Sequence, residues 1–538
     1  MESTMTPSAS DHDRRPVRGT LLVSDRVLTL GHGRKHARAL IVRGSRVVWV
    51  GDDPEQAPPH QDRVDLRGCV IGPAFVDAHV HLTPMGLALT GLDLSRVSSG
   101  AELLQAVATY AGAHTGRVVW GHGFDPHGFS DPLPTPDDLA RVAGGRAVYL
   151  SRVDGHASLV DRRTISAAPL ARSEGIERDA AGEPTGMLRR EANHIVRRWS
   201  VGAMEEAELE VARREAVGHA ARLGVASVHE MGSPDVMGLG DLDRWLEGEW
   251  PIEVVAYWAG LDVQTALARD LRHVGGDLFL DGSLGSHTAA LSEPYADLPT
   301  TSGHLELDDD TLTAWYLEAT RAGLQTAVHA IGDAAIRQVV RCWRSVSERL
   351  REDGIHDAVR RGRHRVEHAE VLPPELLDAI AELGLVISAQ PAFETLWGGD
   401  HGMYVARLGA ERAGWTNPFR ALADRGVGLA FGSDANVTPM DPWETVMAAQ
   451  HRADPDHEVS RLEAVSMSTL GGRHAARQDR YVGVVRAGMR ADLAVFEDDP
   501  YRADDPRGTR CVATLSQGRI AHGDLPLPDA PGRVVLAG

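Results

Sequence analysis

The chain has 538 residues and a formal net charge of −20 at pH 7, an acidic balance that argues against a nucleic acid or an anionic membrane surface as partner. Its 43% hydrophobic and 25% charged residues are ordinary for a soluble globular protein, and its length exceeds what one small core organises. The three cysteines, Cys69, Cys342 and Cys511, are far apart, which argues against a disulfide framework or a cysteine-based zinc site.

The N-terminal segment, residues 1–18, is polar and lacks the apolar core of a secretory signal. No apolar run in the sequence reaches the length needed to span a membrane. We therefore expect a cytoplasmic protein with a disordered N-terminus that acts on a small molecule and binds neither nucleic acid nor membrane. A homo-oligomer is compatible with the sequence.

Short β-branched strands separated by turns occur near both ends of the chain. The N-terminal pair is "GTLLVSDRVLTL" and "ARALIVRGSRVVWVG", and the C-terminal pair is "ADLAVFEDDP" and "VATLSQGRIAHG". Neither pair has enough strands to bury a core by itself. We predict one small β-sandwich domain formed jointly by residues 19–72 and 481–538.

Between these ends, short apolar strands alternate with amphipathic helical segments, which is the pattern of a (β/α)8 barrel. The predicted strands, in chain order, are "AFVDAHVHL", "VASVHE", "IEVVAYW", "DLFLDG", "LQTAVHA", "HRVEHAE", "LVISAQ" and "VGLAFGSD". We therefore predict an α/β fold with a (β/α)8 TIM barrel over residues 73–480. An insertion over about residues 92–199 follows the first strand.

Candidate metal ligands stand at the ends of four predicted strands. The first strand carries two histidines separated by one residue, so both project from the same face. Polar residues at the carboxyl ends of barrel strands face the catalytic mouth. Nitrogen and oxygen donors without thiolate favour Zn²⁺, with Mn²⁺, Co²⁺ or Fe²⁺ as alternatives. The candidates are His79, His81, His329, His368 and Asp434.

This residue set predicts hydrolysis by activated water. A zinc ion lowers the pKa of bound water to about 7 and polarises a carbonyl oxygen. Asp434 is expected to ligate the ion, accept the proton of the water and pass it to a leaving nitrogen. His368 either ligates the ion or donates to the developing oxyanion. Catalytic roles are therefore assigned to Asp434 and His368.

Five further residues are candidate substrate contacts, each with a structural alternative. Asp154 and His156 in "VDGHASLV" belong either to the substrate pocket or to a structural turn. His229 ends the second strand and faces the mouth, where support of the ligands is an alternative role. Asp281 and His287 lie on a glycine-rich loop after the fourth strand. The alternative is that the glycines of this loop only permit an unusual backbone conformation.

The motifs resemble the metal-dependent amidohydrolase superfamily, and more narrowly the branch that includes N-substituted formamide deformylases. The resemblance implies a β-sandwich-flanked barrel that hydrolyses a carbon–nitrogen bond, usually in an amide or cyclic amide. It also implies the five metal-site roles assigned above. The motifs are "GPAFVDAHVHL", "DGHASLV", "GEPTGMLRREA", "GVASVHEMG", "DGSLGSHTAAL", "AVHAIGDAAI", "RVEHAE", "FGSDANVTPMDPW" and "GVVRAGMRADLAVFEDDP".

Two alternative functions remain at this point. A metal-dependent deaminase of a ring amine uses a similar ligand set. A glutamate soon after the histidine of the fifth strand would favour the deaminase, but Asp333 stands at that place and argues against it. A non-catalytic binding protein on the same fold is the second alternative, and the intact ligand set argues against it.

The expected number of metal ions depends on a departure from the family pattern. Relatives commonly carry a lysine in the fourth strand whose carbamylated side chain bridges two ions. Here Asp277 stands at that position, and the only lysine of the chain is Lys35. Asp277 either bridges two ions directly or is too short to reach them. We expect one tightly bound ion on His79, His81, His329 and Asp434, with His368 nearby.

Overall fold

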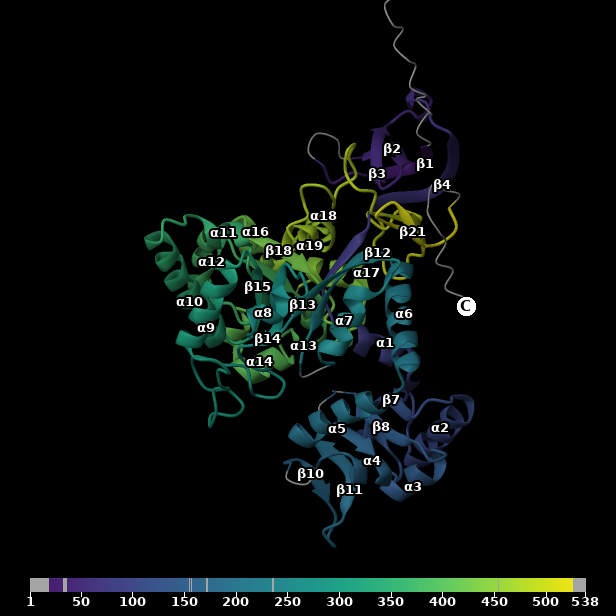
Figure 1. Cartoon of the computed structure of the whole chain (residues 1–538), viewed down its shortest axis with the longest axis vertical. Helices are drawn as coiled ribbons and strands as arrows, with labels where there is room; N and C mark the ends of the chain where they lie inside the picture. The colour runs from purple at the N-terminus through teal and green to yellow at the C-terminus, as the bar shows by residue number, and fades with distance from the viewer. Residues whose placement is uncertain are drawn as a thin grey trace, which may run out of the picture.

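The structure is a computed structural model that describes residues 19–31, 36–153, 155, 157–170, 173–234, 237–452 and 454–525. Figure 1 shows a barrel flanked on one side by a sheet from both ends of the chain and on the other by an insertion. The predicted disordered segment, residues 1–18, lies outside the described residues. No helix within the described ranges is long and apolar enough to cross a membrane.

The barrel contains all eight strands that the sequence predicts. Two parallel sheets, in the orders β13-β12-β5 and β14-β15-β16-β17-β18, form its wall. β13 lies beside β14, and β18 lies beside β5, where Asp434 N donates to His79 O at 2.8 Å, so the wall closes. The strands are β5 (Phe75–Val80), β12 (Val225–Gly232), β13 (Glu253–Trp258), β14 (His273–Phe279), β15 (Gln325–Ala330), β16 (Arg365–His368), β17 (Val386–Ala389) and β18 (Gly428–Phe431).

Helices surround the barrel because the outward faces of its strands are apolar and need cover. Val274, Val328 and Val366 are each fully buried in the main hydrophobic core, together with helical residues such as Val339 and Trp343. The helices after β12 are α7 (Leu239–Glu247), α8 (Val263–Leu267), α9 (Asp309–Arg321), α10 (Asp333–Glu352), α11 (Ala358–Gly362), α12 (Leu377–Leu383), α13 (Pro391–Trp397), α14 (Met403–Leu408), α15 (Ala410–Ala413), α16 (Phe419–Asp424), α17 (Pro442–Gln450), α18 (Arg461–Ser466) and α19 (Gly472–Ala475). α1 (Leu82–Thr90) and α6 (Glu206–Arg222) precede β12.

The two ends of the chain share one seven-stranded sheet, in the order β21-β20-β19-β4-β1-β2-β3. The expected sandwich is thus built from a single hydrogen-bonded sheet, with apolar clusters formed by alternating residues: Leu22 and Leu40 belong to one cluster, Leu21 and Ile41 to another. The strands are β1 (Thr20–Leu28), β2 (His36–Arg43), β3 (Arg46–Gly51), β4 (Asp62–Pro73), β19 (Leu493–Glu497), β20 (Cys511–Ser516) and β21 (Arg519–His522).

The insertion after α1 forms a second small sheet, in the order β10-β11-β9-β8-β7-β6. It contacts α1, because His122 lies 2.8 Å from Ala88 O and Tyr110 donates to Thr90 O at 3.3 Å. The insertion therefore lies next to α1, the helix that follows β5 (Figure 1). Its elements are β6 (Leu92–Asp93), α2 (Gly100–Ala113), β7 (Val118–Phe124), α3 (Pro136–Val142), β8 (Ala147–Arg152), β9 (Ala157–Val160), α4 (Arg162–Ala167), β10 (Ile176–Arg178), β11 (Pro184–Arg189) and α5 (Arg190–Ala203).

Candidate metal centre

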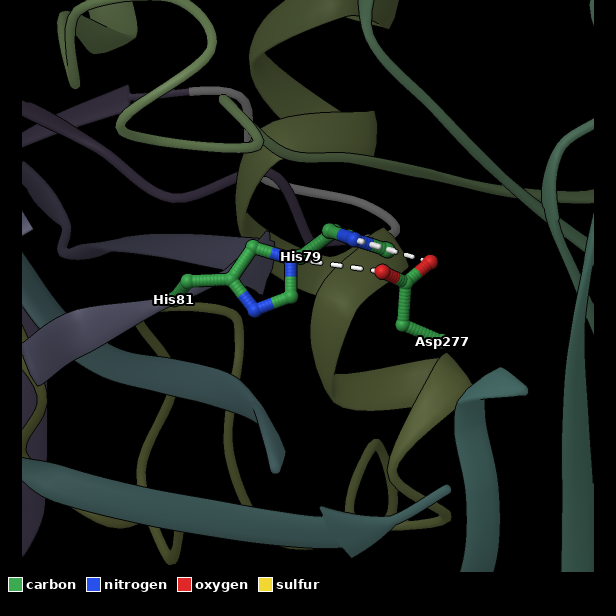
Figure 2. Close-up of side chains that lie close together, drawn as sticks. All are labelled: His79, His81 and Asp277. Atoms are coloured by element: carbon green, nitrogen blue, oxygen red, sulfur yellow. Dashed lines mark ion pairs between the residues drawn. The ribbon is translucent and has the colours of Figure 1, made fainter. Parts of the chain in front are cut away.

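Four histidines and two aspartates converge at the carboxyl ends of the barrel strands. All six are buried or nearly so, with side chains no more than 12% exposed. Figure 2 shows three of them, His79, His81 and Asp277, with both imidazoles pointing at the carboxylate. The six are His79 on β5, His81 directly after it, Asp277 on β14, His329 on β15, His368 on β16 and Asp434 after β18.

The separations around His81 are those of ligands on one ion. His81 Nε2 lies 3.4 Å from Asp277 Oδ2 and 3.5 Å from Asp434 Oδ1, and His79 Nε2 lies 3.6 Å from the same Asp434 oxygen. Zinc bonds of about 2.1 Å at tetrahedral angles place neighbouring donors about 3.4 Å apart. These donors therefore need little movement to share an ion.

Asp277 lies at the middle of the cluster. Its Oδ1 lies 3.0 Å from His329 Nδ1, 3.5 Å from His368 Nε2 and 3.9 Å from His79 Nε2. The shorter side chain therefore does reach the other candidate ligands. Asp277 also changes which candidate ligands lie within reach of one ion. His329 groups with Asp277 and His368, whereas the sequence predicts that it binds the same ion as His79 and His81.

Three of the histidines bind a hydrogen-bond acceptor through the ring nitrogen that faces away from the cluster. His79 Nδ1 donates to Glu367 Oε2 at 2.9 Å, and His368 Nδ1 donates to Gln390 Oε1 at 2.8 Å. His329 Nε2 lies 3.3 Å from the carbonyl oxygen of Gly282. For His79, a proton held on Nδ1 leaves Nε2 of the neutral ring with a free lone pair, which is how metal-binding histidines are usually oriented. His329 and His368 instead face the Asp277 carboxylate with their inner nitrogens, and they donate to it when both ring nitrogens carry a proton.

The cluster also contains polar atoms for which the described residues supply no hydrogen-bond partner. His79 Nε2 and Asp434 Oδ1 are both buried and unpartnered in this sense. A buried polar atom without a partner costs free energy, and such atoms at a site of convergent ligands are compensated when a cation binds. The residues present therefore fit a divalent metal ion.

The charges of the cluster favour a cation. Burial lowers the pKa of the His81 and His368 imidazoles, but hydrogen bonds to Asp277 and the nearby carboxylate charges outweigh it, raising these pKa values to about 9 and about 10. Burial acts in the opposite direction on Asp277, yet its hydrogen bonds to the histidines hold its pKa well below the usual range. The site therefore concentrates negative potential.

The five candidate substrate residues have different surroundings from one another. Two of them, Asp154 and His156, lie outside the described residues. His229 is fully buried inside the barrel, where Nδ1 accepts a hydrogen bond of 2.8 Å from Arg365. Burial, together with the charge of this arginine, keeps the pKa of His229 well below its usual range, which favours the neutral ring. A role of His229 in supporting the ligands, rather than in contacting substrate, stays a prediction.

Asp281 and His287 are engaged by the chain itself. The Asp281 carboxylate accepts hydrogen bonds of 2.8–3.0 Å from the backbone N–H groups of Ala290, Ile331 and Gly332, so it organises the loops beside the cluster. His287 Nε2 lies 3.1 Å from Asp297 Oδ1, and neither joins the metal cluster. Substrate contacts by Asp281 and His287 stay predictions.

A sequence model of the amidohydrolase family matches residues 62–522. The chain belongs to the amidohydrolase family. YtcJ of Bacillus subtilis (strain 168) is 30% identical to this amidohydrolase over 482 residues, covering 83% of this chain and 87% of YtcJ. The N-substituted formamide deformylase of Arthrobacter pascens is 24% identical over 524 residues, covering 90% of this chain and 94% of the deformylase.

Solved structures agree with this assignment. A metal-dependent hydrolase from Pyrococcus furiosus is 30% identical to this amidohydrolase, with a TM-score of 0.76 over 90% of this chain and 100% of that chain. A second, from Pyrococcus horikoshii OT3, is 26% identical, with a TM-score of 0.75 over 91% of this chain and 99% of that chain. The His/Asp cluster and these relatives together indicate a metal-dependent hydrolase of the amidohydrolase family.

Proposed function

We propose that this amidohydrolase hydrolyses a carbon–nitrogen bond other than a peptide bond, in an amide, a formamide or a cyclic amide. The observation that carries the proposal is the convergence of four histidines and two aspartates, with unpartnered His79 Nε2 and Asp434 Oδ1, at the carboxyl end of the barrel. The likeness to the deformylase of Arthrobacter pascens supports a formamide among the candidate substrates.

The proposed metal ligands are His79 Nε2, His81 Nε2 and Asp434 Oδ1, with Asp277 supplying a further carboxylate oxygen. A divalent ion there, most simply Zn²⁺, lowers the pKa of water and polarises a substrate carbonyl. His329 and His368 both face Asp277 Oδ1, so they hold this carboxylate in place.

The chain's own groups supply the proton transfers. Asp434 Oδ1 has no hydrogen-bond partner among the described residues, so this oxygen is available to a cation, and the other carboxylate oxygen would accept a proton from the attacking water and deliver it to the leaving nitrogen. His368 Nε2 faces the same space and donates to the carbonyl oxygen as negative charge develops there. The other nitrogen of this ring, Nδ1, donates a hydrogen bond to Gln390 Oε1 and so fixes the orientation of the ring.

A panel of N-formyl, N-acyl and cyclic amides, assayed with the zinc-loaded full chain, tests the function. We expect release of amine or ring opening for at least one amide class and no ammonia release from ring amines. Hydrolysis of ring amines alone would instead favour a deaminase. Asp333, the residue that bears on this alternative, is engaged by Ser292, whose backbone N–H donates to Asp333 Oδ1 at 2.9 Å.

The first prediction concerns the number of metal ions that each chain binds. Because donors around His81 have the spacing of one coordination sphere and no carbamylated lysine is available in the barrel, we expect a metal-to-chain ratio near one. Elemental analysis after purification without chelator measures it. Asp277→Ala should weaken metal retention. A reproducible ratio of two, unchanged by Asp277→Ala, contradicts both the count and the role of Asp277.

An exposed aromatic side chain beside the cluster bears on the substrate. Phe279 is 38% exposed, and its ring packs edge-on against His329 with the centroids 4.6 Å apart. It lies two residues after Asp277, on the same face of β14. An exposed aromatic ring at the mouth of a polar site favours a substrate with an apolar substituent.

We therefore expect Phe279→Ala to lower kcat/KM about tenfold, roughly 1.4 kcal/mol, for an amide with an aromatic substituent. An otherwise identical methyl-substituted amide should be affected much less. Leu462→Ala is the matched control, because Leu462 is a similarly exposed apolar side chain, 44% exposed, on α18, which carries none of the cluster residues. An equal loss for both amides would show that Phe279 supports His329 rather than binding the substituent.

A further inference from the structure

One fully buried ion pair lies inside the barrel behind His79. Arg365 and Glu367 are two residues apart on β16, so both side chains point to the same side of the strand. Each side chain is 0% exposed. Arg365 binds the carboxylate in a bidentate manner, with Nε to Oε1 and Nη2 to Oε2 both at 2.8 Å.

The remaining donors of the Arg365 guanidinium are also used. Nη1 donates to His229 Nδ1 at 2.8 Å and to Tyr257 Oη at 2.9 Å. Nη2 also donates to Ala78 O at 2.6 Å and to Ser388 Oγ at 2.9 Å. These partners lie on β12, β13, β5 and β17, so one guanidinium joins β16 to four other strands. All five N–H groups have acceptors, which fixes the ion pair rigidly.

Glu367 transmits this rigidity to His79. Its Oε2, held by Arg365, accepts the Nδ1–H of His79 at 2.9 Å. His79 thereby has a charged acceptor, whereas the outer nitrogens of His329 and His368 face neutral oxygens of Gly282 and Gln390. A carboxylate holds the proton on Nδ1 more firmly than a neutral oxygen does. In the neutral ring the lone pair is then on Nε2, which faces the cluster.

We propose that Arg365 and Glu367 are positioning residues that fix the tautomer and orientation of His79 for metal binding. The inference rests on the proposed metal site. Without the carboxylate, the neutral imidazole is free to carry its proton on Nε2 and present no lone pair to the ion. The carboxylate also makes Nε2 a stronger donor to a cation. Both effects act on metal affinity rather than on the fold.

Zinc affinity of the full-length protein tests this, measured by competition with a chromophoric chelator. Glu367→Gln keeps the shape and an acceptor oxygen but removes the charge, and we expect roughly 10- to 100-fold weaker binding. Glu253→Gln is the matched control, because Glu253 pairs with Arg473 and Arg490 in a largely buried position apart from the metal cluster. Its zinc affinity should stay within about twofold of wild type.

The melting temperature of each metal-free variant separates positioning from stability. Both substitutions break a buried arginine–carboxylate pair and should lower it. Glu367→Asp retains the charge on a shorter side chain, so its zinc affinity should lie between those of Glu367→Gln and wild type. It replaces Glu367→Gln if that variant does not fold.

Unchanged zinc affinity in the folded Glu367 variants would overturn the inference and leave a structural role only. Equal weakening in Glu253→Gln would overturn it as well, because the effect would then follow stability. Absence of zinc binding by the wild-type protein is a different result, since it contradicts the proposed function itself.

Discussion

Asp434→Asn should abolish amide hydrolysis while the protein remains folded. The substitution keeps the size of the side chain but replaces the carboxylate, whose Oδ1 lies 3.5–3.6 Å from His79 and His81, with a neutral amide. Loss of general acid–base catalysis alone lowers rates by roughly 10²- to 10⁴-fold, and a weakened metal site adds to this. Initial rates on the best amide of the panel, with enzyme assayed at saturating zinc, measure the effect.

The fold should survive because the backbone contacts of Asp434 are unchanged. Its N–H still donates to His79 O, the contact that joins β18 to β5. Circular dichroism and the melting temperature of the variant provide the control. His79→Ala should give a similar loss of activity. Turnover near the wild-type level in either variant, at saturating zinc in buffers otherwise freed of metal ions, would remove these residues from the site.

Deletion of all residues after Val485 should yield insoluble or misfolded protein. The deleted part contains β19, which pairs with β4 in the middle of the terminal sheet. It also removes Phe496, which is fully buried and packs against Phe75 and Trp443 of the barrel region. The truncation therefore opens the sheet and the adjoining face of the barrel together.

The magnitude follows from the buried side chains that are lost. Leu493, Val495, Phe496 and Leu515 are each no more than 1% exposed. At about 2 kcal/mol each, their burial is worth about 8 kcal/mol, comparable with the whole stability of a domain. The soluble fraction after expression and the far-UV spectrum measure the outcome. A soluble truncation that hydrolyses the amide substrate would show that the C-terminal strands are dispensable.

The barrel was predictable because its strands and ligands follow simple spacing rules. Each apolar run from "AFVDAHVHL" to "VGLAFGSD" forms a strand, and His79 and His81, two residues apart, both face the same cluster. The shared edge of the parallel strands then brings His329, His368 and Asp434 to the same place. The local sequence pattern and the barrel topology were therefore sufficient to predict that these residues lie close together.

The supporting contacts were harder to predict because they depend on packing across the barrel. Glu367 and Arg365 stand in the quoted motif "RVEHAE", and two charged residues on one face of a predicted interior strand were a usable signal. Their partners, such as Tyr257 and Ser388, come from distant strands and have no sequence signal. The contacts of Asp281 depend on the conformation of its loop, because backbone N–H groups donate hydrogen bonds to its carboxylate. The sequence carries no signal for these contacts.

Removal and restoration of the metal tests the central claim most directly. The full-length protein is freed of metal with a chelator, and amide hydrolysis is followed while Zn²⁺ is added back and bound metal is measured. Activity should disappear with the metal and return in proportion to the zinc bound, approaching its limit near one ion per chain in the wild type. Asp434→Asn should not recover. Undiminished amide hydrolysis by protein shown to be metal-free would contradict the account.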